Sequence, residues 1–334
     1  MHNRKIVFEA PWQVSLRQEE LTLSPGKGEM LVETQYSLIS TGTELACLSG
    51  NEGWFKMPAV PGYCCVSRVV ESGEDAPYKP GEIIFHYGMH CRYQLTSPGD
   101  YNLIARVPED LDIRSIPMVR MATIAFTAIR VSDIQLGDTV LVCGLGLVGN
   151  MAAQLARLSG ATVIGVDPAP ARRELAGKVG IDCVANPEEA GRIVGIVTEG
   201  QGCNTVIEAT GIPACAEKCL EYVGYHGEII FLGTPRGDYQ ANLANVLRFS
   251  HLDELGCVTF KGAHEWRLPT VRDRFTKHSI ERNTQVCFDQ LLKGRLHVTE
   301  LVSHVLKPEE AADVYMKLNS DRNAYLGIII DWKE

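Results

Sequence analysis

The stretch that decides the fold reads TVLVCGLGLVG, at residues 139–149. Its apolar, β-branched beginning predicts a buried strand, and the glycines after it predict a tight turn into a helix. The segment that follows, NMAAQLARLSG, repeats Met151, Leu155 and Leu158 at helical spacing. A second buried-strand pattern, TVIGVD, ends at Asp167. These patterns together predict a strand–turn–helix–strand unit of an α/β fold.

The three glycines of the turn suit a phosphate-binding loop. Gly144 permits the tight turn, Gly146 lets a pyrophosphate approach the backbone, and Gly149 lets helix and strand pack closely. The helix start adds amide donors and the positive end of a dipole. A GxGxxG run alone is weak, but strand, glycines, helix and second strand stand here in the required order. The predicted cofactor loop comprises Gly144, Gly146, Leu147, Val148 and Gly149.

The acid at the end of the second strand bears on the choice of cofactor. Asp167 lies 23 residues after Gly144, where a carboxylate can accept hydrogen bonds from both ribose hydroxyls of an adenosine. It would also repel a 2′-phosphate, which favours NAD. Arg172 and Arg173 follow closely, and arginines there can receive a 2′-phosphate, which leaves NADP open. We predict NAD, bound in part by Asp167 and Arg172.

Three further strand patterns extend this unit. They read DCVANP at 182–187, NTVIEATG at 204–211 and GEIIFLGTP at 227–235. The spacing predicts a doubly wound parallel sheet, in which ligands bind at the carboxyl ends of the strands. The turns predicted to line the cofactor cleft contain Ala209, Thr210, Gly211, Leu232, Gly233 and Thr234.

The composition is that of a globular protein without a nucleic-acid surface. The 334 residues suffice for two domains, and 45% of them are hydrophobic. The formal net charge is -9 and there is no Lys/Arg-rich block, so no nucleic-acid partner is expected. No run approaches the roughly 20 apolar residues of a membrane span. The start MHNRKIVFEAPWQV lacks a signal-peptide core, and 11 scattered cysteines suit a reducing compartment. We expect a cytoplasmic protein with a small-molecule substrate.

The two ends of the chain differ from the middle. Residues 1–118 have short strands and turns rich in Gly and Pro, such as SPGKGE and YKPGE, which predict a β-rich domain. Near the C-terminus, CFDQLLKGRL and PEEAADVYMKLNS read as helices, and TELVSHVLK and AYLGIIIDW read as strands. We therefore expect a β-rich domain, a central nucleotide fold and a returning tail.

At this point the whole chain resembles the medium-chain dehydrogenase/reductase superfamily, which includes zinc alcohol, sorbitol and threonine dehydrogenases. The resemblance rests on STGTELACLSG, VPGYCCVSRVVESG, KPGEIIF and ATIAFTAIR, together with GLGLVG. It implies a GroES-like catalytic domain at 1–118, completed by 265–334, and a Rossmann dinucleotide-binding domain at 119–264. It also implies that Thr127, in ATIAFTAIR, lies at the cofactor, and that the protein is a homodimer paired through the edges of its nucleotide sheets.

The resemblance breaks at the catalytic zinc. Carried over position by position, the three zinc ligands of the family fall at Thr41, at Tyr63 and near Thr123. Zinc takes thiolate, imidazole or carboxylate ligands, which these residues lack. The optional structural zinc needs four close cysteines, and its region, about 86–105, contains only Cys91. We therefore predict neither metal.

The alternative is an unorthodox metal site. Its candidate ligands are Cys64, Cys65, His86, His90 and Cys91. Consecutive residues on a strand point to opposite faces, so Cys64 and Cys65 cannot easily bind one ion. The favoured interpretation is a core cysteine with loop histidines near a pocket.

Without zinc, protein groups must handle the proton that accompanies hydride transfer. Thr43 matches a family hydroxyl that relays protons, and the phenol of Tyr63 replaces a zinc-binding imidazole. Glu44 takes the place of an acid that supports the metal shell, and His86 follows the KPGEIIF strand. We predict these four residues to be catalytic. The alternatives are cavity filling for Tyr63 and structural roles for Glu44 and His86.

The stretches expected near the substrate are polar and aromatic. HYGMHCRY at 86–93 and KGAHEWRLP at 261–269 suit a hydroxyl-rich sugar, cyclitol or polyol. The residues predicted to bind substrate are Thr41, His90, His264 and Trp266. The predicted function is NAD-dependent, zinc-independent interconversion of a secondary alcohol and a ketone. Two alternatives stay open: a zinc-free NAD(P)H-dependent quinone or enone reductase, and a non-catalytic NAD(H) sensor.

Overall fold

The computed structural model describes residues 1–321 and 323–333 of the chain. These residues form two compact units. Unit 1 comprises Met1–Arg120, Pro269–Leu292 and Leu301–Glu334, and unit 2 comprises Met121–Leu268 and Lys293–Glu300. The boundary near Arg120 lies inside one helix, α2 (Val119–Val131).

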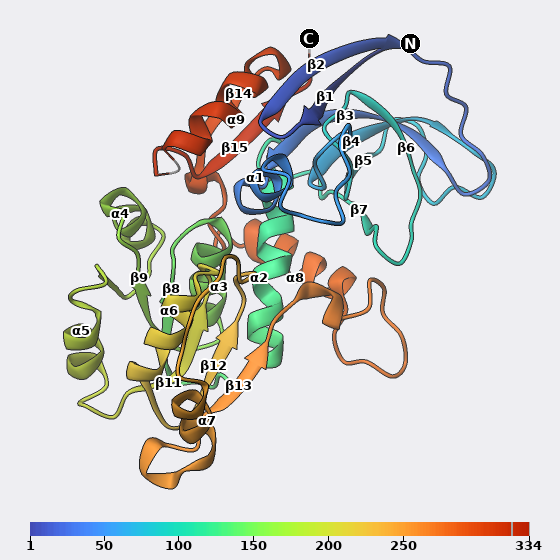
Figure 1. Cartoon of the computed structure of the whole chain (residues 1–334). Helices are drawn as coiled ribbons and strands as arrows, with labels where there is room; N and C mark the ends of the chain where they lie inside the picture. The colour runs from blue at the N-terminus through green and yellow to red at the C-terminus, as the bar shows by residue number, and fades with distance from the viewer. Residues whose placement is uncertain (322, 334) are drawn as a thin grey trace. The chain divides into compact units, whose positions relative to one another are not determined.

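Unit 2 contains a six-stranded sheet of order β10-β9-β8-β11-β12-β13 (Figure 1). Every neighbouring pair in it is parallel. The chain begins in the middle at β8, runs outward to β10, and then returns to β11 on the other side of β8. The carboxyl ends of β8 and β11 therefore flank the switch point of a doubly wound sheet. The strands are β8 (Thr139–Cys143), β9 (Thr162–Val166), β10 (Cys183–Ala185), β11 (Cys203–Glu208), β12 (Val223–Phe231) and β13 (Thr259–Gly262).

The central strands of unit 2 are apolar because both of their faces are covered. Val140, Leu141 and Val142 of β8 are fully buried, as a strand between two helix layers requires. The helical segments are α3 (Leu147–Leu158), α4 (Pro170–Lys178), α5 (Ala190–Val197), α6 (Pro213–Lys218), η2 (Cys219–Glu221), α7 (Leu243–His251), η3 (Asp253–Leu255) and η4 (Glu265–Arg267).

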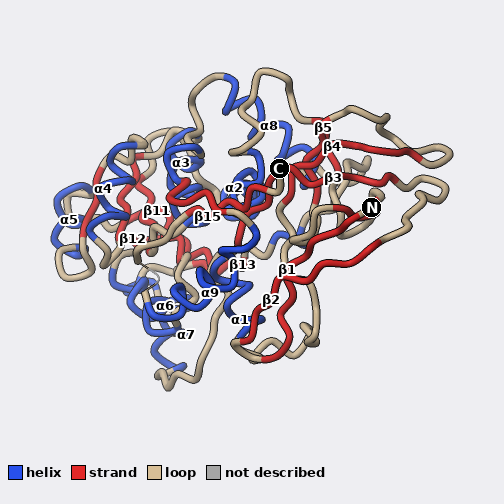
Figure 2. Tube along the Cα trace, turned by 90° about the horizontal axis from the view of Figure 1, so that it is seen from above, coloured by secondary structure: helices blue, strands red, loops and turns tan. Residues whose placement is uncertain are grey.

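Unit 1 is built on a seven-stranded sheet and a separate hairpin. The sheet order is β14-β15-β3-β4-β5-β7, with β6 paired to β3. The strands β1 and β2 lie side by side as an antiparallel hairpin (Figure 2). The strands are β1 (His2–Ala10), β2 (Gln13–Glu20), β3 (Met30–Ile39), β4 (Cys65–Ser72), β5 (Ile83–His86), β6 (Tyr93–Thr96), β7 (Ile104–Arg106), β14 (Val302–Leu306) and β15 (Gly327–Asp331).

The C-terminal tail completes this sheet. Strand β15 pairs antiparallel with β3, so that Ile328 faces Ile39. Phe8 and Tyr315 pack edge to face in the adjoining core, with ring centroids 5.0 Å apart. The remaining helical segments are α1 (Thr41–Leu48), η1 (Ile116–Met118), α8 (Ile280–Leu292), η5 (Thr299–Leu301), η6 (Pro308–Glu310) and α9 (Ala311–Ser320).

The predicted α/β fold, with a GroES-like β-rich part and a Rossmann sheet, is confirmed. Two local expectations were less accurate. The helix expected in CFDQLLKGRL begins earlier, at Ile280, and ends at Leu292, because Gly294 has a φ of 62° that suits a helix terminus. TELVSHVLK begins as a 3-10 turn before β14. Among the described residues, none of the helices has the length and apolarity to span a bilayer.

Candidate functional site

The predicted cofactor loop sits at the carboxyl end of β8 in a conformation that requires glycine. Gly144 has a φ of +91°, and its amide donates to the Val166 carbonyl at 2.8 Å. A Cβ on Gly149 would lie 1.8 Å from the Gly144 carbonyl oxygen. Gly146 has a non-helical φ and ψ as the N-cap of α3, and a Cβ there would meet nothing within 4 Å. The loop therefore packs closely on one side and stays open above Gly146.

The two turns predicted to line the cofactor cleft lie side by side. A Cβ on Gly211 would lie 2.3 Å from the Thr234 carbonyl oxygen, and one on Gly233 would lie 2.2 Å from the Gly211 amide nitrogen. Thr210 also approaches the loop, since its Cγ2 would lie 2.7 Å from a Cβ on Gly144. Ala209 donates its amide to the Cys143 carbonyl at 2.9 Å. The carboxyl ends of β8, β11 and β12 thus form one backbone-lined edge.

Glu208, which the sequence analysis did not select, fixes this edge. Its carboxylate accepts the Thr210 amide at 2.7 Å and the Gly211 amide at 3.1 Å. Its carbonyl accepts the Leu232 and Gly233 amides at 2.8 and 2.9 Å. Burial raises the pKa of the Glu208 carboxyl, against the hydrogen bonds from Thr210. The sequence feature that could have identified Glu208 is its position as an acid at the end of the buried strand pattern NTVIE.

Asp167 is buried and bound by the protein itself. One carboxylate oxygen accepts the Leu145 amide and the other accepts the Ala169 amide, each at 2.8 Å. Arg172 Nη1 lies 3.5 Å from the first of these oxygens, and Arg173 donates to the Asp167 carbonyl at 2.6 Å. Asp167 therefore ties the cofactor loop to the end of β9.

The remaining predicted cofactor residues of unit 2 differ in exposure. Leu147 is buried and Val148 half-buried at the start of α3, while Leu232 is half-buried and Thr234 exposed. Thr127 in α2 is buried, and its hydroxyl has no hydrogen-bond partner among the described residues. The open backbone above Gly146 and this unpaired hydroxyl are features that a bound dinucleotide could use.

In unit 1, three hydroxyls meet at Tyr63. The Tyr63 phenol donates to Ser40 Oγ at 2.5 Å and lies 3.3 Å from Thr43 Oγ1. The Arg120 guanidinium faces the Tyr63 ring at 5.2 Å and the Tyr87 ring at 3.8 Å. Burial raises the pKa of the Tyr63 phenol above its ordinary value, and the Arg120 cation opposes that rise. We refer to Tyr63, Ser40, Thr43 and Arg120 as the Tyr63 cluster.

Glu44 lies behind the Tyr63 cluster in a buried polar network. One of its oxygens accepts the Ser40 amide at 2.7 Å. The other accepts the Tyr315 hydroxyl and lies 3.1 Å from His90 Nε2. His90 Nδ1 lies 2.8 Å from Ser37 Oγ. With the carboxylate ionised, His90 donates through Nε2 and accepts at Nδ1, which satisfies both ring nitrogens. We refer to these residues as the Glu44 network.

His86 has a different environment. Its Nε2 lies 2.7 Å from Ser67 Oγ, and its Nδ1 has no hydrogen-bond partner within residues 1–321 and 323–333. Burial lowers the pKa of His86 to about 3, so the ring is neutral at pH 7. No described hydrogen bond joins it to the Tyr63 cluster.

The residues at the family's zinc positions do not fit zinc. Thr41 is the first residue of α1, Tyr63 precedes β4, and Thr123 is buried in α2. All three offer hydroxyls rather than the ligands zinc takes. The unorthodox set of Cys64, Cys65, His86, His90 and Cys91 also fails. In the described part of the chain, no three of them bring their ligand atoms within 4.8 Å of one another.

The other residues predicted to bind substrate are distributed between the units. Thr41 is half-buried in unit 1, and His90 belongs to the Glu44 network. His264 is exposed and Trp266 half-buried, both in unit 2 at η4. The structure thus joins Thr43 to Tyr63 and Glu44 to His90, and pairs His86 with Ser67.

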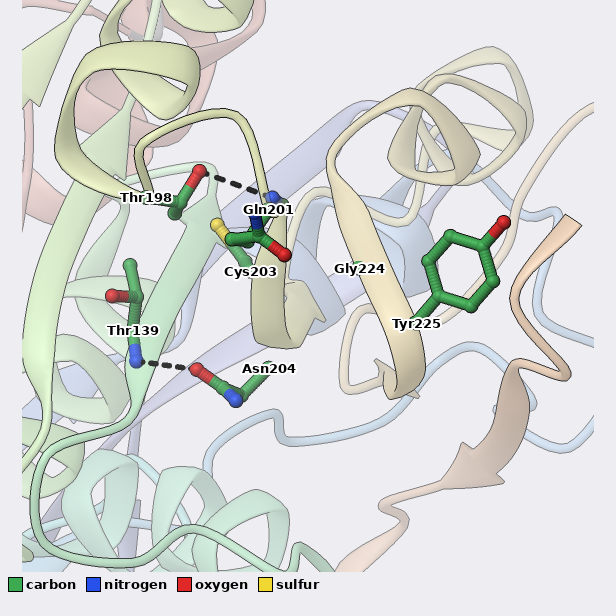
Figure 3. A pocket seen from close by; sticks show the side chains of 8 residues that line it. Thr139, Thr198, Gln201, Cys203, Asn204, Gly224 and Tyr225 are labelled. Atoms are coloured by element: carbon green, nitrogen blue, oxygen red, sulfur yellow. Dashed lines mark hydrogen bonds between the residues drawn. The ribbon is translucent and has the colours of Figure 1, made fainter.

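Each unit also contains a surface pocket. In unit 1, a pocket of about 420 Å³ is lined by polar and aromatic residues that include Tyr87, Met89, Gln94 and Asn102. In unit 2, a pocket of about 260 Å³ opens beside Thr139, Cys203 and Tyr225 (Figure 3). Thr139 and Cys203 begin their strands, so this second pocket lies at the amino edge of the sheet, opposite the predicted cofactor edge.

Comparison with known proteins places these features in context. Residues 148–273 match a family model described as zinc-binding dehydrogenase. The chain is 25% identical over 260 residues to a D-guloside 3-dehydrogenase of Shigella flexneri, covering 77% of this chain and 72% of that protein. It is 28% identical over 318 residues to an L-threonine 3-dehydrogenase of Pyrococcus horikoshii, covering 85% of each.

Solved structures share the fold. A protein of Sinorhizobium meliloti 1021, solved with bound NADP, superposes with a TM-score of 0.80 at 21% identity, covering 99% of this chain and 100% of that one.

Proposed function

We propose that the protein is an oxidoreductase that interconverts a secondary alcohol and a ketone with NAD and without zinc. The chain belongs to the medium-chain dehydrogenase/reductase superfamily, which supports the reaction class. The observation that carries the zinc-free mechanism is the Tyr63 cluster. A phenol and two hydroxyls stand where the zinc members place a metal ligand and its proton relay.

The chain's own groups then move the proton. When bound, the nicotinamide cofactor would supply the hydride transfer to or from the alcohol carbon. The Tyr63 phenol is protonated at neutral pH, as phenols ordinarily are, and its hydrogen bonds to Ser40 and Thr43 place it as a hydrogen-bond and proton donor to the ketone oxygen. Ser40 and Thr43 lie within reach to pass a proton back to the phenol. Arg120 faces the ring and stabilises any negative charge that develops on it.

Glu44 acts as a positioning residue in this mechanism. Its carboxylate accepts the Ser40 amide at 2.7 Å and so fixes the residue to which the Tyr63 phenol donates. His90 and Tyr315 in turn fix Glu44. His86 is neutral and joined to Ser67, so in this proposal it shapes the interior of unit 1 rather than carrying a proton.

The substrate class is a sugar-, cyclitol- or polyol-like alcohol. The pocket of about 420 Å³ in unit 1 is lined by polar and aromatic side chains, among them Tyr87, which contacts Arg120, and Tyr101. Polar groups of this kind recognise hydroxyls. A relative at 25% identity is named a D-guloside 3-dehydrogenase. His264 and Trp266 remain further predicted contacts.

We propose NAD as the cofactor because a buried acid, Asp167, directly follows β9. Arg172 and Arg173 are the residues that would favour NADP, which the Sinorhizobium meliloti structure contains. Fluorescence titration with both reduced cofactors distinguishes the two. NADH is expected to bind at least about tenfold more tightly, a difference of roughly 1.4 kcal/mol. Equal or tighter binding of NADPH would contradict the assignment.

The reaction class is tested with a substrate panel. The purified protein is incubated with NAD⁺ and sugars, cyclitols and polyols, and NADH formation is recorded. Turnover of one of these alcohols supports the proposal. Consumption of NAD(P)H with quinones or enones only, or binding of NADH without any turnover, contradicts it in favour of a reductase or a sensor.

We further propose that two copies pair through the outer edge of β13. This strand ends the sheet of unit 2, so its outer side has no described strand neighbour. Sedimentation of the protein is expected to give a dimer. A monomer at micromolar concentration would contradict this.

A further inference from the structure

Three cysteine thiols meet inside unit 2, and the proposed function uses none of them. Cys143 ends β8, Cys215 lies in α6, and Cys219 begins η2. Their sulfur atoms all lie within 4.8 Å of one another, and the Sγ atoms of Cys143 and Cys219 are 3.8 Å apart. Within the described residues, this is the one such group of His, Cys, Asp or Glu.

The spacing of the sulfurs suits a shared cation better than a disulfide. Zinc–thiolate bonds of about 2.3 Å in tetrahedral geometry place neighbouring sulfurs roughly 3.8 Å apart. A disulfide needs its sulfurs at about 2.05 Å, far closer than Cys143 and Cys219 lie. All three thiols are free. Cys215 and Cys219 stand four residues apart, one helical turn, so both can face the end of β8.

The surroundings of the thiols favour thiolate binding as well. Cys143 and Cys219 are buried, while Cys215 is partly exposed and offers an entry path. The Cys219 thiol donates to the Cys143 sulfur, and the sulfur of Cys215 lies within 4.8 Å of both. The side chains of Glu208 and Thr210 lie within hydrogen-bonding reach of Cys215.

We propose that Cys143, Cys215 and Cys219 form a three-thiolate site for a thiophilic divalent cation, with Zn²⁺ as the expected occupant. The fourth position, on the exposed side of Cys215, is taken by water. Binding releases protons from the thiols and forms three metal–sulfur bonds, with no change of oxidation state. This site departs from the sequence prediction of no metal. Cys143 and Cys219 lie 76 residues apart in the chain, so their spacing does not reveal it.

This site would change how a metal analysis of the protein is interpreted. Cys143 immediately precedes Gly144, so a bound ion would join the end of β8, next to the predicted cofactor loop, to α6 and η2. Zinc found in the purified protein would then not imply a catalytic zinc. The proposal is independent of the proposed function, because it is tested by binding alone.

The test is a titration of the reduced full-length protein with Cd²⁺, followed by ultraviolet thiolate-to-cadmium absorption. A competition between the protein and a chromophoric chelator for Zn²⁺ accompanies it. We expect one ion per chain, with a Kd for Zn²⁺ below about 1 µM, and release of protons to a pH indicator. Cys215→Ser and Cys219→Ser should each weaken binding by more than about 100-fold, since even outer partners of a metal cost 10–100-fold.

The matched control is Cys257→Ser, which removes another partly exposed cysteine of unit 2 outside the cluster. It should bind like the wild type. Circular dichroism verifies the fold of each variant, and Cys215→Ala replaces Cys215→Ser if that variant misfolds. The proposal is overturned if the wild type shows no cadmium absorption, if Cys215→Ser and Cys219→Ser bind as tightly as the wild type, or if Cys257→Ser loses binding equally.

Discussion

The cofactor edge of unit 2 and the Tyr63 cluster of unit 1 are built from different chemical groups. The cofactor edge of unit 2 is mostly backbone: glycines, most of which admit no Cβ, amides, and two buried acids that accept amide hydrogen bonds. The Tyr63 cluster and Glu44 network of unit 1 are side chains joined by hydrogen bonds. A backbone site fails when the chain path changes, whereas a side-chain site fails when one functional group is removed. The variants below test whether each site fails in the way that this difference predicts.

The largest effect is expected at the phenol of Tyr63. Tyr63→Phe keeps the ring and removes the only group that could donate a proton from this position. The kcat of alcohol–ketone interconversion should fall by about 10²–10⁴-fold, the usual contribution of a general acid or base. NADH binding, measured by fluorescence, should stay unchanged. Tyr225→Phe, at an exposed tyrosine on the amino edge of the sheet of unit 2, is the control. Unchanged turnover in Tyr63→Phe would remove the phenol from the mechanism.

Glu44→Gln tests the network behind the phenol. The carboxylate accepts hydrogen bonds from the Ser40 amide, His90 and Tyr315. The glutamine side chain has only one acceptor oxygen, so its NH₂ group would face at least one of these three donors. Removing one partner from a buried charged network costs on the order of 3 kcal/mol. Urea unfolding should show this loss. Glu71→Gln, at an exposed position of β4, should stay within roughly 0.5 kcal/mol of the wild type. Equal stability of both variants would refute the network.

Gly149→Ala tests the backbone edge. The added Cβ would lie 1.8 Å from the Gly144 carbonyl oxygen, so the loop must move. We expect NADH affinity to fall about 10- to 100-fold, or roughly 1.4–2.7 kcal/mol. Gly195→Ala in α5, where a Cβ meets nothing within 4 Å, is the matched control and should bind NADH normally. A Gly149→Ala protein with full affinity would show that this loop does not contact the cofactor.

The last variant tests the pH dependence of His86, whose effect per pH unit is about as small as the lower limit for Gly149→Ala. Its folded pKa of about 3 lies below the ordinary value of 6.5, so between these values the unfolded chain binds a proton that the native protein does not. The free energy of unfolding therefore falls as pH drops through this window, by about 1.4 kcal/mol per pH unit from this group. His86→Gln should remove that part of the slope between pH 6 and 4. A slope identical to that of the wild type would mean that His86 titrates normally.

The same contrast explains what the sequence could predict. The glycine loop could be predicted from the residue types alone, because only glycine fits at Gly144 and Gly149. The fold class followed from that loop and from the strands around it. The roles of the selected residues at either site remain predictions, including those of His86, His264 and Trp266.

The side-chain network could not be predicted in this way. Trp332 donates to Ser37 from 295 residues away, and Tyr315 reaches Glu44 across 271. The spacing of residues along a short stretch of sequence cannot predict contacts between residues so far apart in the chain. Arg120 did leave a signal, as a lone charge in the apolar run SIPMVRMATIAF, and it lies buried against Tyr63 and Tyr87. The thiol cluster likewise joins β8 to α6 and η2, which are separate along the chain.

The central claim is that unit 1 handles the proton without a metal. The most direct measurement is turnover of an alcohol substrate after exhaustive chelation, followed by addition of zinc, in the wild type and in Cys215→Ser. We predict that the wild type keeps its kcat after chelation and gains nothing from zinc, and that Cys215→Ser behaves in the same way. Activity that disappears on chelation and returns with zinc in both proteins would contradict the account.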